Sequence, residues 1–141
     1  MHALTNIHRS IRPDGLLLDI QPEPLRPTVE VRQAQGAKAI GSLDRSDLIA
    51  SIDAARGAIA EAVSQRRFRP EAETTFEYRS HFASYDEWIA YRIAKRYLEG
   101  NMSPLSLEDD PLRAAVRNLL MHETGEIVER EQVRALKMRR L

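Results

Sequence analysis

The chain has 141 residues, of which 43% are hydrophobic and 30% are charged, a composition typical of one globular domain. Lysine plus arginine and aspartate plus glutamate both number 21, which excludes the broad positive field that binds nucleic acid non-specifically. There is no cysteine and no apolar run approaching the roughly 20 residues that span a bilayer, so we expect a cytoplasmic protein without a membrane partner.

The start of the chain predicts a helix followed by a buried strand. Apolar side chains recur at spacings of three and four across residues 1–12, which gives a short helix one apolar face. Pro13 ends the helix, and Asp14-Gly15 supplies a turn. The uninterrupted apolar run at residues 16–20 predicts a strand that is covered on both faces, as in a parallel sheet.

A short hairpin and a long helix are expected next. The proline-rich residues 21–27 predict an extended, irregular segment. Residues 28–31 and 37–43 form two extended candidates on either side of a turn, which predicts the hairpin. Asp44 or Ser46 is expected to cap a helix that runs to about residue 65. Its predicted apolar face consists of Leu48, Ile52, Ala55, Ile59 and Ala62.

Strand and helix alternate in the rest of the chain. Residues 72–82 have the period of two that indicates a strand with one half-buried face. Ser84 and Glu87 have the spacing of a capping box and predict a helix to about residue 98, with Gly100 as its end.

One more helix and a final strand complete the predicted elements. Asp110-Pro111 is expected to open a helix that Gly125 ends. In residues 126–140 neither period is clean, but Leu136 and Met138 alternate with basic residues, which suits a strand.

Residues 4–20, with the sequence LTNIHRSIRPDGLLLDI, resemble the later part of a class I S-adenosylmethionine-dependent methyltransferase. In that family a helix with a pattern like L-x-x-x-x-R-x-L-R-P-G-G leads into the fifth strand of a doubly wound sheet. Asp14 stands where the family has the first glycine, a mild departure because aspartate tolerates left-handed backbone. The resemblance implies that residues 72–82 and 126–140 are similar to the antiparallel sixth and seventh strands.

The resemblance covers only the second half of the family's fold. The family holds S-adenosylmethionine against a glycine-rich loop after the first strand and an acidic residue that ends the second. The six glycines here form no such loop, so we expect no cofactor in this chain. The expected fold is α/β, or an α+β fragment: the C-terminal part of a Rossmann-like methyltransferase sheet, with about three main strands, flanking helices and a short hairpin in a single domain over residues 1–141.

The function implied is the substrate side of a methyltransferase, inactive alone. The alternative is a non-enzymatic α+β module for interaction or oligomerisation. We expect a homodimer or a complementing methyltransferase half as partner, since in the family the strand at residues 16–20 is internal and a fourth strand pairs along its edge. The other possibility is that the hairpin at residues 28–43 folds back over that edge and leaves a monomer.

The substrate-side candidates are His81, Tyr78 and Asp19. His81 and Tyr78 lie near the end of a predicted strand, where pockets in α/β sheets open, although a hydrogen-bonded histidine in a strand is common. Asp19 lies near the end of the apolar strand and has the carboxylate of a base, but no nucleophile is paired with it by any readable spacing. The four histidines lack the spacing of metal ligands, so no catalytic, cofactor-binding or metal-binding residue is assigned.

Overall fold

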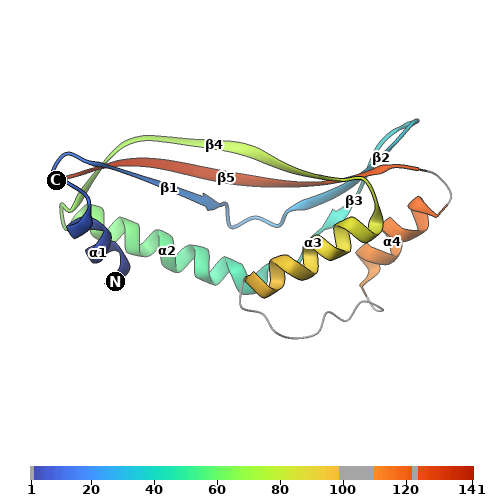
Figure 1. Ribbon diagram of the computed structural model, residues 1–141, viewed down its shortest axis with the longest axis horizontal. Helices are drawn as coiled ribbons and strands as arrows, with labels where there is room; N and C mark the ends of the chain where they lie inside the picture. The colour runs from blue at the N-terminus through green and yellow to red at the C-terminus, as the bar shows by residue number, and fades with distance from the viewer. Residues whose placement is uncertain (1, 99–109, 122–123) are drawn as a thin grey trace. The chain divides into compact units, whose positions relative to one another are not determined.

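The computed structural model describes residues 2–98, 110–121 and 124–141 and shows an α+β fold (Figure 1). The α+β class and the hairpin are therefore confirmed. The elements, in chain order, are α1 (His2–Ser10), β1 (Leu16–Pro22), β2 (Thr28–Gln33), β3 (Gly36–Ser42), α2 (Ser46–Ser64), β4 (Phe68–Phe82), α3 (Tyr85–Leu98), α4 (Pro111–Leu120) and β5 (Glu126–Arg140). Gly100 and His122 lie outside the described residues.

The described residues form a sheet of five strands, and β5 is its centre. Strand β5 pairs antiparallel with β1 and with β2, β3 pairs antiparallel with β2, and β4 pairs with β5. Two of these strands, β2 and β3, form the hairpin. The parallel neighbour expected for residues 16–20 is not among the described strands.

The chain divides into two compact units, each with its own hydrophobic core. Unit 1 consists of Met1–Leu25, Arg45–Tyr78 and Glu131–Leu141. Unit 2 consists of Arg26–Asp44 and Arg79–Arg130. Strands β4 and β5 contribute residues to both units. Among the described residues, no helix is long and apolar enough to cross a membrane.

In unit 1, helices α1 and α2 cover one face of the strands (Figure 1). Leu17 of β1 packs there with Leu136 and Met138 of β5, which confirms the inward positions expected for these two residues of the last strand. The helices contribute the apolar side chains that the spacings predicted, among them Leu4, Ile7, Ile11, Ile59 and Ala62.

In the turn before β1, the residue with the left-handed backbone is Asp14 and not Gly15. Asp14 takes the left-handed conformation, with φ of 59°, whereas Gly15 does not have a positive φ. Glycine is required at position 15 by close approach, because a Cβ atom there would lie 2.3 Å from Ile11 Cγ2 and 2.8 Å from the carbonyl oxygen of Arg12. The backbone of the turn therefore lies directly against Ile11 and Arg12, the two residues that follow α1.

Two helix ends differ from the expectation. Arg45 holds the cap position of α2 rather than Asp44 or Ser46, and its side chain makes no capping hydrogen bond. The side chain pairs instead with Glu131 of β5. Helix α4 ends at Leu120, before Gly125, whose Cβ-free backbone lies close to the carbonyl oxygen of Arg32.

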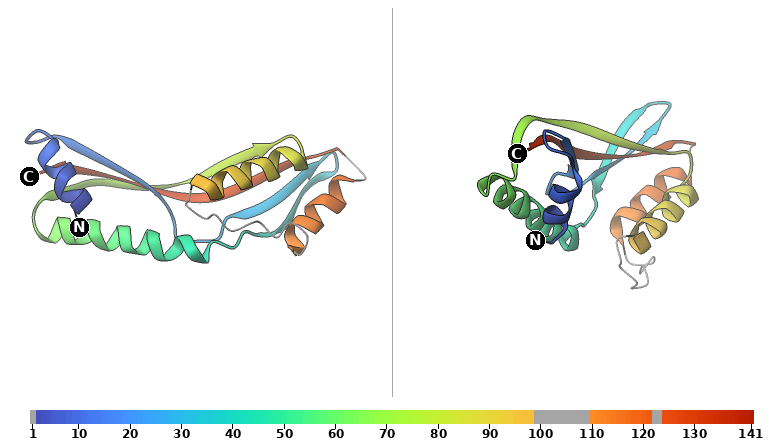
Figure 2. Two further views of the ribbon diagram at one scale, coloured as in Figure 1. Left: turned by 60° about the horizontal axis from the view of Figure 1, so that its bottom comes forward. Right: turned by 60° about the vertical axis from the view of Figure 1, so that its left-hand side comes forward.

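Unit 2 is built around Trp88, which is fully buried. Helices α3 and α4 contact each other, as the right-hand view of Figure 2 shows. The predicted caps are present: Ser84 Oγ accepts from the backbone N–H of Glu87 at 3.1 Å, and Asp110 accepts from that of Leu112 at 3.0 Å. The core around the indole consists of Val29, Val31, Leu43, Phe82, Val116 and Ile127.

Candidate functional site

The described residues cover β1 on one face only, so the prediction of a strand buried on both faces is wrong for this part of the chain. Leu17 packs into the core of unit 1. Leu16, Leu18 and Ile20 point to the opposite face and are 51%, 60% and 57% exposed. We call the face that carries these three side chains the open face of β1. Three large apolar side chains in a row at alternate positions form a continuous apolar stripe.

The outer edge of β1 also has no partner among the described strands, since β5 alone pairs with it. The backbone groups of odd-numbered residues point toward β5. The carbonyl oxygen of Gly15 accepts from Arg140 N at 2.9 Å, and Glu23 N donates to the carbonyl oxygen of Gln132 at 2.7 Å. Because the direction alternates along a strand, the N–H and C=O groups of Leu16, Leu18 and Ile20 point to the outer edge.

The hairpin does not cover this edge. Strand β2 pairs with β3 and with the Glu126–Arg130 part of β5, and β1 pairs with β5 from Val133 onward. The possibility that the hairpin folds back along residues 16–20 is therefore wrong. What the sequence did not indicate is that β5 is long enough to pair with both β1 and the hairpin.

The edge strand β4 is exposed in a different way. Its middle residues are exposed on both faces, so the half-buried face predicted for residues 72–82 is wrong. Charged residues and Pro70 protect it from unwanted pairing. Glu71 contacts Arg139 and Lys137 of β5, and the hydrogen bond from Arg139, more than the nearby positive charge, lowers the pKa of the Glu71 carboxyl.

Asp19 lies in a polar cluster near the carboxyl end of β1, on the face turned toward the core. Gln21 Nε2 donates to its Oδ1 at 2.8 Å, and Arg134 Nη2 lies 3.6 Å from its Oδ2. Glu23, two residues beyond Gln21, accepts from Arg56 at 2.6 Å. Each carboxylate here has a cationic partner, so Asp19 is engaged in ion pairing and hydrogen bonding rather than presented as a base.

Neither Tyr78 nor His81 is brought together with Asp19 by a described contact. Tyr78 ends the Arg45–Tyr78 segment of unit 1 and is 51% exposed. His81 belongs to unit 2, where its Nδ1 lies 2.9 Å from Glu126 Oε1. A histidine paired with a carboxylate across two strands matches the structural reading of His81.

Unit 2 holds two buried carboxylates that sequence reasoning did not single out. Glu129 is 5% exposed, and Trp88 Nε1 donates to its Oε1 at 2.6 Å. Glu30 accepts from Arg32 Nε at 2.6 Å and lies 2.8 Å from Arg130. Burial alone raises the pKa of Glu30, but hydrogen bonds and charge from both arginines outweigh it and lower the pKa.

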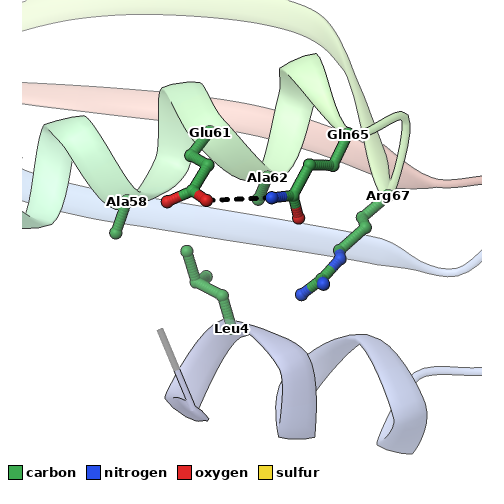
Figure 3. Close-up of a pocket in the computed structure, with 6 residues that line it drawn as sticks. All are labelled: Leu4, Ala58, Glu61, Ala62, Gln65 and Arg67. Carbon is green, nitrogen blue, oxygen red and sulfur yellow. Dashed lines mark hydrogen bonds between the residues drawn. The ribbon is translucent and has the colours of Figure 1, made fainter.

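A shallow hollow lies between α1 and α2. Leu4 of α1 points toward Ala58 and Ala62 of α2 there (Figure 3). Its volume of about 10 Å³ admits about one water molecule, which is too small for a substrate. The polar side chains at its rim are engaged, since Gln65 Nε2 donates to Glu61 Oε1 at 2.9 Å and Arg67 donates to Thr5 at 2.6 Å.

Comparison of the chain with protein-family models, with curated proteins and with solved structures gives no match. The function must therefore be argued from the geometry. Among the described residues, the outer edge of β1 has no paired strand and its open face is apolar and exposed. The polar clusters form ion pairs within the chain, although buried atoms such as Asp19 Oδ2 and Arg134 Nη2 have no hydrogen-bond partner. The candidate functional site is therefore the open face and outer edge of β1.

Proposed function

We propose that the chain forms the substrate side of a class I methyltransferase-like fold in the cytoplasm and does not bind S-adenosylmethionine by itself. The observation that carries this proposal is the passage from α1 through the Asp14-Gly15 turn into β1. In the resembling family, the same passage leads into the fifth strand. Asp14 adopts the left-handed backbone that the family's glycine would adopt most easily, and Gly15 lies close to Ile11 and Arg12, which follow α1.

The order of the later elements supports the proposal. After β1 and the hairpin come helix α2, strand β4, two further helices and strand β5. Strand β5 pairs with both β1 and β4, so β5 lies beside the proposed fifth strand and β4 lies beside β5. The family's helix after the fifth strand would correspond to α2, and the hairpin would be an insertion before it.

The unpaired edge of β1 gives the proposal a physical consequence. The family places a fourth strand along this edge and helices over both faces of the sheet. Here the described elements do not cover the apolar side chains of Leu16, Leu18 and Ile20, and no described strand pairs with the outward backbone groups of these three residues. A protein that supplies a cofactor-binding half would therefore complete both the sheet and the methyltransferase site.

The test is calorimetric titration with S-adenosylmethionine. We expect no binding to the chain alone, because it lacks the contacts that a glycine loop and a ribose-binding acid provide. We expect micromolar binding when the chain is joined behind the cofactor-binding half of a class I methyltransferase. The matched control is the same chimaera with Leu18→Lys, which disturbs the shared edge. Micromolar binding by the chain alone, or a folded chimaera that binds no cofactor, would contradict the proposal.

A second candidate is a non-enzymatic module for interaction or oligomerisation. The specific observation in its favour is the exposed apolar stripe on β1, which is typical of a protein interface. In this case the methyltransferase-like elements serve only as a scaffold. The chimaera would then fold without acquiring affinity for S-adenosylmethionine.

A further inference from the structure

We propose that β1 of one copy pairs antiparallel with β1 of a second copy, around a two-fold axis that passes through Leu18. This inference concerns the chain on its own and does not rest on the methyltransferase resemblance. It assigns the outer edge and the open face of β1 to a single occupant, another molecule of the same protein.

The backbone selects the register. With Leu18 opposite Leu18 of the second copy, Leu16 lies opposite Ile20, and each residue whose N–H and C=O point outward meets another such residue. All outward groups of the three residues are then satisfied in both copies.

Registers displaced by two residues are less favourable. If Leu18 lies opposite Ile20, Pro22 lies opposite Leu16 and cannot donate a hydrogen bond to it, because proline has no N–H. The same register places Asp19 opposite Asp19 of the second copy, and two like charges at opposed positions destabilise the pair. Displacement in the other direction places Ile20 opposite Asp14, which lies outside the strand. The two-fold axis at Leu18 is therefore the register that the sequence of β1 favours.

The side chains fit the same arrangement. Directly opposed residues of an antiparallel pair project to one face, so Leu16, Leu18 and Ile20 of both copies form a single apolar cluster. Each of these side chains is more than half exposed in the single chain, so contact across the axis removes apolar surface from water.

The distribution of charge favours a second copy at β1 rather than at β4. Strand β4 has charged residues along its length, whereas the outward positions of β1 are apolar. On the open face, Lys137 and Arg139 of β5 lie beside Leu18 and Leu16. In the dimer two β1 strands separate the β5 strands by about 14 Å. This spacing exceeds the screening length of about 10 Å at 0.1 M salt.

Cysteine cross-linking tests the register, because the chain has no native cysteine. Leu18→Cys should form a disulfide-linked dimer under mild oxidation, since opposed Cα atoms lie about 5.5 Å apart. Leu16→Cys and Ile20→Cys should each fail to cross-link alone, because the two equivalent residues are displaced by about 13 Å along the strands. A mixture of these two variants should cross-link. Phe76→Cys, on an exposed site of β4, is the matched control.

Light scattering of the full chain over about a hundredfold dilution tests the assembly itself. We expect a dimer mass that falls toward the monomer mass on dilution, and a monomer for Leu18→Lys with its melting transition retained. Leu17→Lys is unsuitable as the test because Leu17 packs in the core of unit 1. Phe76→Lys should leave the dimer unchanged.

Three results would overturn the proposal. The first is a monomer at every concentration. If that monomer also forms a one-to-one complex with the cofactor-binding half of a class I methyltransferase, the outer edge of β1 is the binding site of that half instead of a second copy. The second is a dimer that persists in folded Leu18→Lys. The third is equal cross-linking of Leu16→Cys, Leu18→Cys and Phe76→Cys, which would indicate collisions without a register.

Discussion

Replacing Gly15 with valine should destabilise the protein by displacing α1 from β1. The first side-chain atom at this position would lie 2.3 Å from Ile11 Cγ2, and it would lie 2.8 Å from the carbonyl oxygen of Arg12. That carbonyl accepts from the backbone N–H of Gly15 at 2.9 Å, so the turn cannot open without losing the bond. Ile11 packs against the core of unit 1 and moves with it.

The expected cost follows from these two contacts. Loss of the turn hydrogen bond costs about 1 kcal/mol, and forcing Ile11 out of its packed position costs roughly 1–2 kcal/mol more. Gly57→Ala is the matched control, because a Cβ atom at Gly57 meets nothing within 4 Å. Alanine in place of this helical glycine should stabilise by about 0.5–1 kcal/mol.

Urea denaturation at one fixed protein concentration measures both changes. With a slope of about 2 kcal/mol per molar urea, Gly15→Val should lower the midpoint by about 1–1.5 M. Gly57→Ala should raise the midpoint by about 0.3–0.5 M. Equal midpoints for Gly15→Val and the unaltered protein would refute the argument that close approach, rather than a positive φ, requires glycine here.

Two further predictions concern the carboxylates. Trp88→Phe should lower the free energy of unfolding, measured by urea denaturation, by about 2 kcal/mol, because the buried Glu129 loses the indole donor at 2.6 Å. The same change in a Glu129→Leu background should lower it by less. Equal losses in the two backgrounds would show that the hydrogen bond does not stabilise the protein. The hydrogen bond from Arg139 lowers the pKa of the Glu71 carboxyl below its ordinary value of 4.5 in the folded protein. The pairing therefore stabilises the folded state fully above pH 4.5, and this stabilisation is lost as the pH falls through the lower pKa of the folded state. Glu71→Gln should therefore flatten the loss of stability below pH 4.5 in acid titrations followed by circular dichroism, and an unchanged acid profile would count against this role.

Local signals predicted the helices and their caps well where the cap was the strongest local interaction. The Ser84 and Asp110 side chains satisfy backbone donors within three residues, so neighbours in sequence decide the outcome. At α2 a distant partner decides: Arg45 pairs with Glu131, which is 86 residues away in the chain. No local pattern indicates such a pair.

The candidate site could be predicted only in part, because strand partners are set by long-range pairing. Asp19 was identified by its place near the end of a strand, but its engagement by Arg134 depends on the register between β1 and β5. Glu129 was missed because it lies among charged residues in a segment without a clean period, and nothing in that segment indicates which residue meets a buried donor. Trp88 and Glu129 meet across two elements that are 41 residues apart.

The error over β1 has a different origin and bears on function. An apolar run without alternation indicates a strand that needs cover on both faces, and this reading of residues 16–20 follows from their composition. The described elements provide cover for Leu17 but not for Leu16, Leu18 or Ile20. Exposing such a strand lowers solubility and invites pairing at the edge. If β1 pairs with a second copy as proposed, the apolar pattern describes the paired strand, and Leu16, Leu18 and Ile20 mark the surface that the second copy covers.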